Sequence, residues 1–552
     1  MKREDLARYL SPAELAEFDQ LTAEAAKDRL FFPNPGPQLE AALAIADIVG
    51  YGGAAGGGKS YLIVGLAVSD HTRSAIIRPQ KNQTKKFVDE ITKLLGSTAG
   101  YNSQQSTWKM TTPDGKQRHV EFFGLDNPGD EEKQQGVDFD LKAYDEVTQM
   151  READVRYTLT WNRTDDPKQR VRALLTFNPP TTPEGRWVVR FFAPWLDRTH
   201  PNPAKPGELR WFTTIGDNQD YEVAGPQAFI IKHRADGAPY PCYSFNAADY
   251  TPEQIIRPKS RTFIKARVTD NPYYMATGYI QQLQALPEPL RSQMLEGDFM
   301  AGVEDAADQV IPTAWIEAAM KRWRELQPRH AKGVMDSLGV DVARSGNMGS
   351  HLGATGNDEM VIAPRHGTYF DTLQIHKGVS IDDGAKAAAL VVAAIRDGAP
   401  VHVDVVGVGT SVYDFLTTNN IHAIPVNGAA ASLGMDKSGL LRFANYRAEL
   451  HWAMRDALDP HNPQPIALPP DEQLLVDLAT PRWKLTKQGV VVESKDDIKK
   501  RLGRSPDRGE AVMYANITTP KRTMILGGFR DLPSNVTGES YEQRRLREIN
   551  GY

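Results

Sequence analysis

Short apolar runs alternate with amphipathic stretches through the first third of the chain. Residues 84–95 repeat apolar side chains at helical spacing, and residues 61–67 are apolar throughout, as in a buried helix. The apolar runs between such stretches are four to eight residues long and end in polar or glycine-rich turns, which is typical of strands in a parallel sheet. We therefore predict strands within residues 44–50, 73–79, 120–125, 139–146 and 171–180.

The same alternation of short apolar runs and amphipathic stretches begins again in the second half of the chain. Strands are expected at 333–343, 359–363, 369–373, 401–405 and 421–426, with helices at 382–396, 411–417, 445–458 and 508–517. The 552 residues would hold two to four domains of about 150 residues each. We predict a first α/β domain over residues 1–260, a lid and linker over 261–330, a second α/β domain over 331–525 and a tail over 526–552. Residues 1–30 are expected to be helical.

Composition is that of an ordinary globular protein, with 40% hydrophobic and 24% charged residues. No apolar run approaches the ~20 residues that a membrane-spanning helix needs, so we expect no membrane contact and a cytosolic protein. The net charge of −5 means that any contact with nucleic acid must use local basic patches or metal ions. Cys242 is the single cysteine, which excludes an intramolecular disulfide and a multi-cysteine zinc site.

A phosphate-binding loop lies between the first predicted strand and helix. The motif G-x-x-x-x-G-K-S is met by Gly53, Gly58, Lys59 and Ser60. Glycines let backbone N–H groups converge on a phosphate, the lysine reaches the β- and γ-phosphates, and the serine hydroxyl ligates Mg²⁺. The nucleotide contacts predicted from this loop, with ATP and Mg²⁺ as ligands, are Gly53, Ala54, Ala55, Gly56, Gly57, Gly58, Lys59 and Ser60.

Polar residues at later strand ends complete a predicted hydrolysis site. Asp145 is expected to hold the Mg²⁺ shell, and Glu146 to act as the base that polarises the attacking water. Thr176 and Asn178 follow the next strand, where they would sense the γ-phosphate and couple hydrolysis to movement. Gln38, about 20 residues before the loop, is expected to read the adenine edge with its amide, or else to be a surface glutamine.

Three aspartates in the second half fall at a strand end, a later strand end and a helix start. If Asp341, Asp404 and Asp507 meet in an apolar α/β core, they repel one another unless cations neutralise them. Two Mg²⁺ or Mn²⁺ ions about 4 Å apart would do so and would make a phosphodiester hydrolase. Asp358 and Glu510 are possible further ligands. The basic residues nearby, a DNA-backbone grip or simply a solvated face, are Lys495, Lys499, Lys500, Arg501 and Arg504.

Taken together, these motifs resemble the large terminase subunit, the genome-packaging motor of tailed bacteriophages. The resemblance spans residues 35–520 and includes two stretches similar to the family's lid markers, 270–272 and 297–299. It implies an ASCE-type ATPase followed by a ribonuclease H-like nuclease, with ATP-driven translocation of double-stranded DNA. It also implies a portal protein, a procapsid and a small terminase subunit as partners, a homo-oligomeric ring, and a place in the host cytoplasm and at the portal vertex.

One departure from the family concerns arginine. Many relatives carry an arginine within the phosphate loop, where this chain has Ala54 and Ala55. Arg163, with Arg156 seven residues earlier on an expected helix, is the predicted arginine finger from a neighbouring subunit, and Arg78 is the alternative within the same subunit. Two other functions stay open at this point: a helicase-like ATPase whose second half binds nucleic acid without cutting it, and an NTP-dependent kinase.

Overall fold

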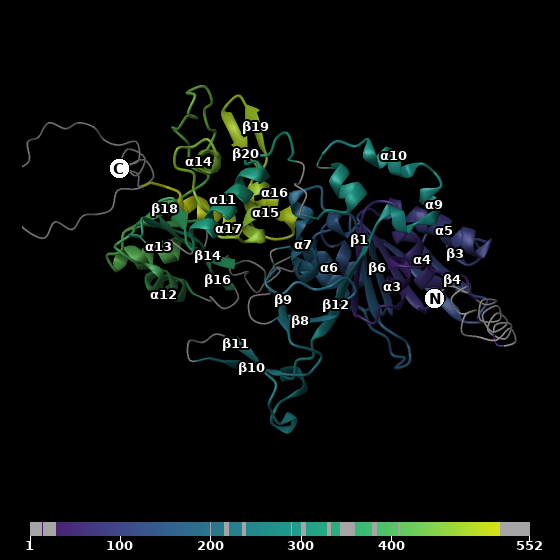
Figure 1. The fold of residues 1–552 in the computed structure, drawn as a ribbon. Helices are drawn as coiled ribbons and strands as arrows, with labels where there is room; N and C mark the ends of the chain where they lie inside the picture. Colours follow the sequence, from purple (N-terminus) through teal and green to yellow (C-terminus); the bar gives the residue numbers. More distant parts are fainter. Residues whose placement is uncertain are drawn as a thin grey trace, which may run out of the picture. The chain divides into compact units, whose positions relative to one another are not determined.

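The computed structural model describes residue 14 and residues 29–198, 200–214, 220–234, 239–288, 290–299, 305–327, 333–342, 359–377, 383–406 and 409–518. These residues form two compact units (Figure 1), Met1–Thr181 with Gly185–Ala301, and Thr182–Glu184 with Gly302–Tyr552. The helix predicted over residues 1–30, the tail at 526–552 and Asp358 lie almost wholly or wholly outside the described residues. No helix in the described ranges has the length and apolar character needed to cross a bilayer.

The first unit is built on one mixed sheet. Its strands and those of a separate hairpin are β1 Ile48–Gly53, β2 Arg73–Arg78, β3 Tyr101–Asn102, β4 Thr107–Thr111, β5 Gln117–Gly124, β6 Leu141–Asp145, β7 Arg172–Phe177, β8 Arg210–Thr214, β9 Asp220–Val223, β10 Ile230–His233, β11 Pro239–Cys242 and β12 Lys259–Ala266. Its helices are α3 Pro37–Leu43, α4 Lys59–Ser69, α5 Lys85–Leu95, α6 Glu152–Leu159, α7 Trp187–Phe191, α8 Ala193–Leu196, α9 Pro272–Met275 and α10 Tyr279–Gln284.

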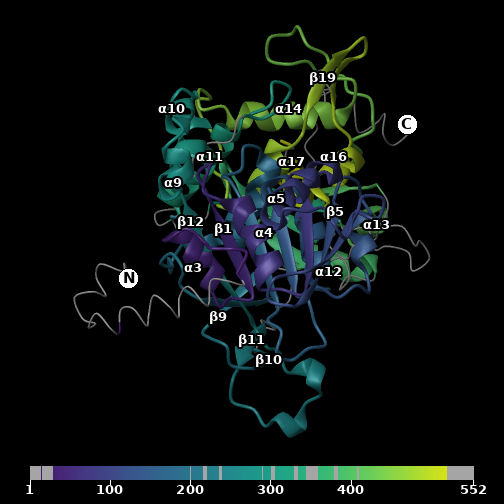
Figure 2. The ribbon, with the colours of Figure 1, turned by 90° about the vertical axis from the view of Figure 1, so that its right-hand side faces the viewer.

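The strand order of this sheet is β3-β4-β5-β2-β6-β7-β1-β12-β8-β9, and the six strands from β5 to β12 are parallel. The predicted α/β fold with a parallel sheet is therefore confirmed. Strand β7 lies between β1 and β6, and all six carboxyl ends meet at one edge of the sheet. The hairpin β10–β11 lies away from this sheet (Figures 1 and 2).

Alternating side chains divide the core of the first unit between the two faces of the sheet. Ile76 of β2 packs with α4 and α5 on the face that Figure 2 turns toward the viewer. Its neighbours Ala75 and Ile77 pack with α6 and α7 on the other face. This period of two, with both faces covered by helices, explains why the strands read as continuous apolar runs.

The division of the chain differs from the prediction. The boundary expected after residue 260 falls inside β12, which pairs in parallel with β1 from Ile48↔Arg261 to Gly53↔Ala266. The first unit therefore continues through the predicted lid. The predicted lid and linker also contain a helix that was not expected, α11 Thr313–Leu326, and its Ile316 and Met320 lie in the core of the second unit. Burial of these side chains, which local sequence does not reveal, sets the boundary.

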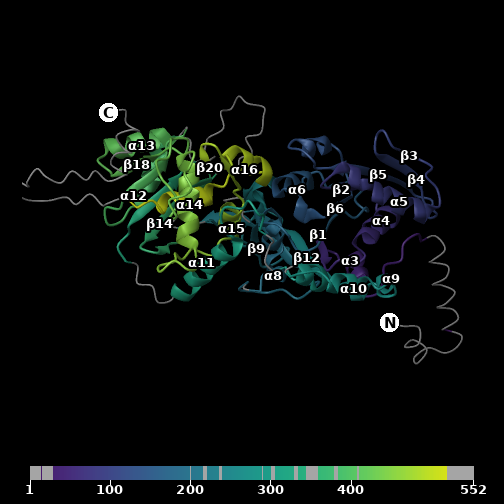
Figure 3. The ribbon, with the colours of Figure 1, turned by 90° about the horizontal axis from the view of Figure 1, so that it is seen from above.

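The second unit has a six-stranded sheet around a central strand β13. Its other elements are β14 Glu359–His366, β15 Tyr369–Phe370, β16 Gln374–Lys377, β17 Val401–Asp404, β18 Ala423–Val426, β19 Trp483–Thr486 and β20 Gly489–Val492, with α12 Gly384–Ala394, α13 Gly409–Thr418, α14 Tyr446–Leu458, α15 Glu472–Ala479, α16 Lys495–Leu502 and α17 Asp507–Ala515. β13 spans Ser337–Asp341, antiparallel to β14 and parallel to β17, and β17 is parallel to β18. Helices α12 and α13 lie beside β18 in Figure 3 and pack on one face, while α11, α14, α15 and α17 pack on the other.

Helix α17 approaches β13 unusually closely. A Cβ on Gly339 would come within 1.9 Å of the Ala511 carbonyl oxygen and 2.3 Å of the Ala515 nitrogen. Only glycine allows this approach, because any side chain would meet helix backbone. The close approach holds α17 against the central strand of the sheet.

A buried lysine in β6 gives the first unit a pH-dependent stability. Lys142 is fully buried, and its ammonium donates to the Gln134 Oε1 at 2.8 Å and the Thr158 carbonyl at 2.6 Å. Burial lowers the pKa of Lys142 to about 7. Between that value and the usual value of about 10.4, the unfolded chain holds a proton that the folded chain has lost, so stability rises with pH in this window. Urea unfolding at pH 7 and pH 9 should show a smaller gain for Lys142→Met than for the wild type.

Candidate nucleotide and metal sites

The predicted phosphate loop joins β1 to α4 at the carboxyl edge of the first sheet. Gly53, Gly56 and Gly58 take φ angles of 128°, 78° and 76°, a region that favours glycine. The Tyr51 hydroxyl donates to the Gly57 carbonyl at 2.6 Å, and this bond fixes the loop against its own strand. The loop leads directly into α4, whose first residue is Lys59, so backbone N–H groups at the helix start face a phosphate site.

Lys59 is held in place by oxygen atoms on both sides. Its Nζ donates to the Ala54 carbonyl at 2.8 Å and to the Asn178 Oδ1 at 2.7 Å. Burial is the main reason that the pKa of Lys59 falls to about 8, with Asp145 opposing the shift. A half-buried ammonium with two neutral acceptors can donate to a phosphate oxygen in exchange for one of them. Asn178, predicted to couple hydrolysis to movement, is thus in direct contact with Lys59, the lysine predicted to bind phosphate.

The carboxyl end of β6, which carries the predicted carboxylates, is separated from β1 by the single strand β7. Thr176 Oγ1 donates to the Asp145 Oδ1 at 2.7 Å, across the β6–β7 pair. Arg78, at the end of β2, is 3.3 Å from the Asp145 Oδ2 and also bonds the Glu146 Oε1. One buried guanidinium therefore bridges both predicted carboxylates.

Glu146 has a left-handed backbone, with φ 60° and ψ 44°. Few non-glycine residues take this conformation, and those that do cluster at functional sites. Its Oε2 accepts from the Gln149 Nε2 at 3.0 Å. Gln149 was not expected near the site, and nothing in its local sequence distinguishes it from a surface glutamine.

Lys86 was also missed from the sequence. Its Nζ donates to the Ser60 Oγ at 2.6 Å, although it lies on the neighbouring helix α5. The hydroxyl of Ser60 is the predicted Mg²⁺ ligand, so Lys86 places a positive charge beside that position. The signal available in sequence, two lysines at a helix start, is common on solvated helices.

Gln38 forms a hydrogen bond with the phosphate loop. Its Nε2 donates to the Gly58 carbonyl at 2.9 Å, and its Oε1 accepts from the Asn34 nitrogen at 2.6 Å. The side chain is buried, so the alternative of a surface glutamine is wrong. Adenine recognition by Gln38 stays a prediction.

The predicted lid stretches contact the same loop. The Asn271 Nδ2 donates to the Gly56 carbonyl and the Ala55 nitrogen to the Met294 carbonyl, both at 2.8 Å. Gly297 lies against Gly53 and Ala54, where a Cβ would come within 2.6 Å of the Ala54 nitrogen. Residues 271–297 are thus built onto the phosphate loop.

The two arginines considered as fingers differ from the prediction in their position. Helix α6 ends at Leu159, so Arg163 does not share a helix face with Arg156. Arg156 is tied within the unit to the Asp220 carboxylate at 3.1 and 2.8 Å and to Glu152. Arg163 bonds Asp138 and its nitrogen donates to the Phe139 carbonyl, just before β6 begins. With six residues at about 3.3 Å each from Phe139 to Asp145, Arg163 lies at the opposite end of the sheet from the phosphate loop.

In the second unit, two predicted aspartates end adjacent parallel strands. Val340 pairs with Val403, one residue before Asp341 and Asp404 respectively. Asp507 begins α17, which packs on β13. All three predicted carboxylates therefore gather at one edge of the second sheet.

Lys495 stands between two of these carboxylates. Its Nζ lies 3.1 and 2.9 Å from the Asp341 oxygens and 3.2 Å from the Asp507 Oδ1. Burial, together with the charges of Asp507 and Asp404, raises the pKa of Asp341 well above its usual range, although Lys495 opposes this. Despite burial, Lys495 keeps the pKa of Asp507 below its usual range.

No group of three or more acidic, histidine or cysteine side chains within the described ranges is arranged tightly enough to hold a metal ion. The ammonium of Lys495 nevertheless occupies the space between Asp341 and Asp507, where two buried carboxylates need a cation. A carboxylate set of this kind fits hard divalent ions such as Mg²⁺ or Mn²⁺ in its chemistry.

Glu510 is engaged elsewhere. Its Oε1 accepts from the Arg447 Nη1 at 2.5 Å and its Oε2 from the Tyr514 hydroxyl at 2.7 Å. Burial opposes ionisation, but the Arg447 guanidinium and Lys495 lower the pKa of Glu510 to about 2. The carboxylate is therefore a charged anchor for α14 against α17.

The basic residues before Asp507 do not form one free surface. Arg501 contacts Glu493 and donates to the Thr480 carbonyl at 2.9 Å, and the Arg504 Nη1 lies 2.6 Å from the Asp477 Oδ1. Lys500 is mostly exposed, with Asp497 at 3.4 Å. Lys495 differs from these residues, because its described contacts are to the predicted catalytic carboxylates Asp341 and Asp507.

Comparison with known proteins gives structural neighbours alone: no protein-family model and no curated protein matches the chain. Large terminase subunits are among the solved structures similar to this chain. The nuclease domain of the large terminase subunit of bacterial virus Sf6 is 23% identical, with a TM-score of 0.31, over 38% of this chain and 99% of that domain. The large terminase of a thermophilic bacteriophage is 12% identical, with a TM-score of 0.31, over 88% of this chain and 98% of that one.

The same bacteriophage terminase with ATP-γ-S bound is 11% identical, with a TM-score of 0.29, over 88% of this chain and 99% of that one. A variant of the Sf6 nuclease domain has been solved with manganese. These likenesses carry no argument for activity, which depends on the side chains described above.

Proposed function

We propose that this chain is a large terminase subunit, a motor that hydrolyses ATP to move double-stranded DNA into a procapsid and cuts DNA with a two-metal nuclease. The observation that carries the proposal is the presence of both sites in one chain. Lys59, Asp145 and Glu146 converge at one sheet edge of the first unit. Asp341 and Asp507 converge on Lys495 in the second.

The first site supports ATP hydrolysis. Backbone N–H groups of the loop and Lys59 would hold the phosphates, while Ser60 and Asp145 would hold Mg²⁺, which neutralises charge on the transferred phosphoryl group. Glu146 would accept the proton of the attacking water. Because Arg78 bonds Glu146 and Asp145, it is an arginine of this unit that would stand beside the developing charge, whereas the phosphate loop supplies Lys59 but no arginine.

The second site supports phosphodiester hydrolysis. Asp341, Asp404 and Asp507 would hold two Mg²⁺ or Mn²⁺ ions, which supply a nucleophilic water and stabilise the leaving oxygen. Lys495 would have to withdraw from between Asp341 and Asp507 to admit them. Contacts to the DNA backbone carry no base information, so cleavage without sequence preference is expected.

The proposed partners follow from this function. They are double-stranded DNA, a portal protein, a procapsid and a small terminase subunit, with the chain acting as a homo-oligomeric ring on the portal. The proposed location is the host cytoplasm and, during packaging, the portal vertex.

A helicase-like ATPase with a second unit that binds nucleic acid without cutting it is the second candidate. Lys495 favours it, because a resident ammonium already neutralises Asp341 and Asp507. The deciding experiment is incubation of supercoiled plasmid with the full chain and Mn²⁺. Nicking that EDTA abolishes supports the terminase, whereas ATP hydrolysis without nicking supports the second candidate. Transfer of phosphate to an acceptor instead of water would indicate a kinase.

A ring assembly makes a prediction for Arg163. If Arg163 completes the site of a neighbouring subunit, Arg163→Ala should lose ATPase activity, and adding Lys59→Ala subunits with an intact Arg163 should partly restore it. An arginine of this kind contributes about 10³–10⁵ in rate where it acts. ATPase activity would be measured across mixing ratios. Full activity in Arg163→Ala alone, or no rescue at any ratio, removes Arg163 from this role.

A further inference from the structure

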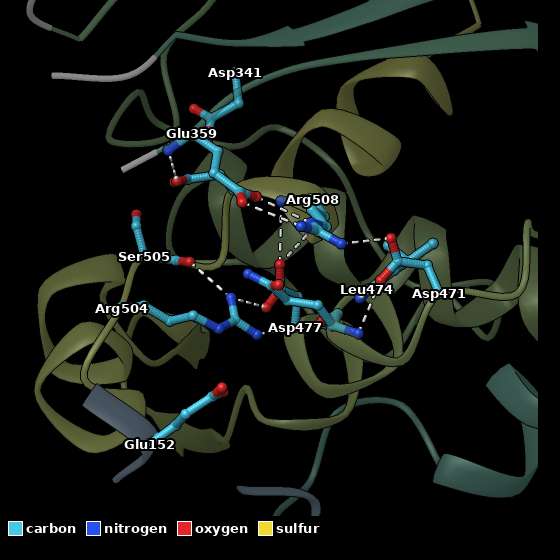
Figure 4. A network of polar contacts seen from close by, with 12 residues as sticks. Glu152, Asp341, Glu359, Asp471, Leu474, Asp477, Arg504, Ser505 and Arg508 are labelled. Carbon is cyan, nitrogen blue, oxygen red and sulfur yellow. Dashed lines mark hydrogen bonds and ion pairs between the residues drawn. The ribbon is translucent and has the colours of Figure 1, made fainter. Parts of the chain in front are cut away.

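A network of charged side chains joins β14, α15, α17 and the turn before α17 in the second unit (Figure 4). We call it the Arg508 network, and its members are Arg504, Arg508, Glu359, Asp471 and Asp477. The Arg508 Nε and Nη2 donate to the two oxygens of Glu359 at 3.0 and 3.1 Å, and its Nη1 donates to Asp471 at 2.6 Å. Each nitrogen of the guanidinium thus has a carboxylate partner.

The centre of the Arg508 network is buried away from solvent, while Arg504, Glu359 and Asp471 are partly buried around it. Arg508 is 4% exposed and Asp477 2% exposed. Asp471 also caps α15, because its Oδ1 accepts from the Gln473 and Leu474 nitrogens at 2.8 and 3.0 Å. A guanidinium so enclosed cannot contact a DNA backbone, and its planar fork instead fixes the carboxylates around it.

Two parts of the network act on Asp507 from different sides. The nitrogen of Glu359, at the start of β14, donates to the Asp507 Oδ2 at 2.9 Å. Asp477 accepts from the Arg508 and Gly509 nitrogens at 3.1 and 3.2 Å, which fixes the first turn of α17. The start of β14 and the start of α17 are thereby locked to one another, with Asp507 between them.

We propose that Arg508, acting through Glu359, is a positioning residue that fixes the Asp507 carboxylate for divalent metal in the second unit. The proposal rests on the proposed nuclease function. Partners behind metal ligands hold the ligands in orientation, and losing one costs about 10–100-fold in metal affinity or activity. Glu359 and Arg508 would set metal affinity without touching DNA or metal.

Glu359→Gln tests the proposal with little change of shape. The substitution removes the charge that binds Arg508 but leaves the backbone N–H that faces Asp507. Mn²⁺ binding to the full chain would be followed by electron paramagnetic resonance of free Mn²⁺, and plasmid nicking by Mn²⁺ titration. We expect the dissociation constant for Mn²⁺ to rise about tenfold. Nicking should return to the wild-type rate at saturating Mn²⁺, with the KM for DNA unchanged.

Arg508→Lys is the second variant, because it keeps the charge but replaces the planar guanidinium, which bonds Glu359 and Asp471 through three nitrogens, with a single ammonium. Its Mn²⁺ affinity should fall between those of wild type and Glu359→Gln. Arg365→Gln is the matched control. Arg365 comes from the same strand, β14, and its Nη1 donates to the Ala515 and Asn516 carbonyls at the far end of α17, at 3.3 and 3.0 Å. It should lower thermal stability and leave Mn²⁺ affinity unchanged.

The outcomes separate the two claims. Unchanged Mn²⁺ affinity in Glu359→Gln, or a raised KM for DNA that Mn²⁺ does not correct, overturns the positioning role alone. A wild-type chain that neither binds Mn²⁺ nor nicks plasmid overturns the proposed nuclease, and the positioning role with it. Equal loss of Mn²⁺ affinity in Arg365→Gln would show a general effect of loosening α17 and would also overturn the positioning role.

Discussion

Glu146→Gln should bind ATP with near wild-type affinity and hydrolyse it about 10²–10⁴-fold more slowly, the range that a positioned base contributes. An amide has the shape of the carboxylate but cannot accept the proton of the attacking water. Glutamine also keeps the Cβ and the side-chain length of Glu146, whose backbone is left-handed with φ 60°. ATP affinity would be measured by calorimetry and turnover by release of phosphate.

Two further variants serve as comparisons for Glu146→Gln. Lys59→Ala should lose ATP binding itself, because the phosphates lose the ammonium that Asn178 and Ala54 hold in the loop. Glu132→Gln, an exposed glutamate of the same unit, should behave as wild type. Wild-type turnover in Glu146→Gln would show that another group accepts the proton, and the assignment of the base would be wrong.

The parts of the first site that depend on local sequence could be predicted. The phosphate loop is one contiguous motif, and positive φ angles at Gly53, Gly56 and Gly58 are what its glycines indicate. The contact between Lys59 and Asn178, 119 residues apart, depends on β7 inserting between β1 and β6. Strand order is set by packing of the whole sheet, so the motif predicted the residues but not their partners.

Errors arose where tertiary contacts decide the outcome. Arg163 was expected on a helix, but α6 ends four residues earlier, and the chain returns to pair with Phe139. Lys495 was expected either to grip the DNA backbone or to lie on a solvated face, yet its ammonium lies between Asp341 and Asp507. A lysine near a helix start reads the same in sequence whether its side chain faces solvent or a buried carboxylate pair. The Arg508 network could not be predicted either, because its members are far apart in the sequence and meet only in the folded unit.

The largest effect expected in the second unit is that of Asp404→Ala on DNA cleavage. Asp404 ends β17 one residue after the Val340↔Val403 pair, so its carboxylate stands beside Asp341 at the same sheet edge. Removing it takes away one of the three proposed metal ligands, and Mn²⁺-dependent nicking of plasmid should fall to the level seen with EDTA. ATP hydrolysis, which we assign to the first unit, should remain.

Asp414→Ala is the matched control, because Asp414 is an exposed aspartate on α13, ten residues after Asp404 in the same unit. It removes the same charge from the surface and should leave nicking unchanged. Asp404→Ala should also weaken Mn²⁺ binding, which separates loss of a ligand from loss of a DNA contact.

The charge of Asp404 helps to raise the pKa of Asp341, so Asp341 should ionise at lower pH in this variant. Any residual cleavage should therefore persist to lower pH than in wild type. Wild-type nicking in Asp404→Ala would mean that cleavage does not need Asp404, and the assignment of the three aspartates at this sheet edge as the nuclease site would be wrong.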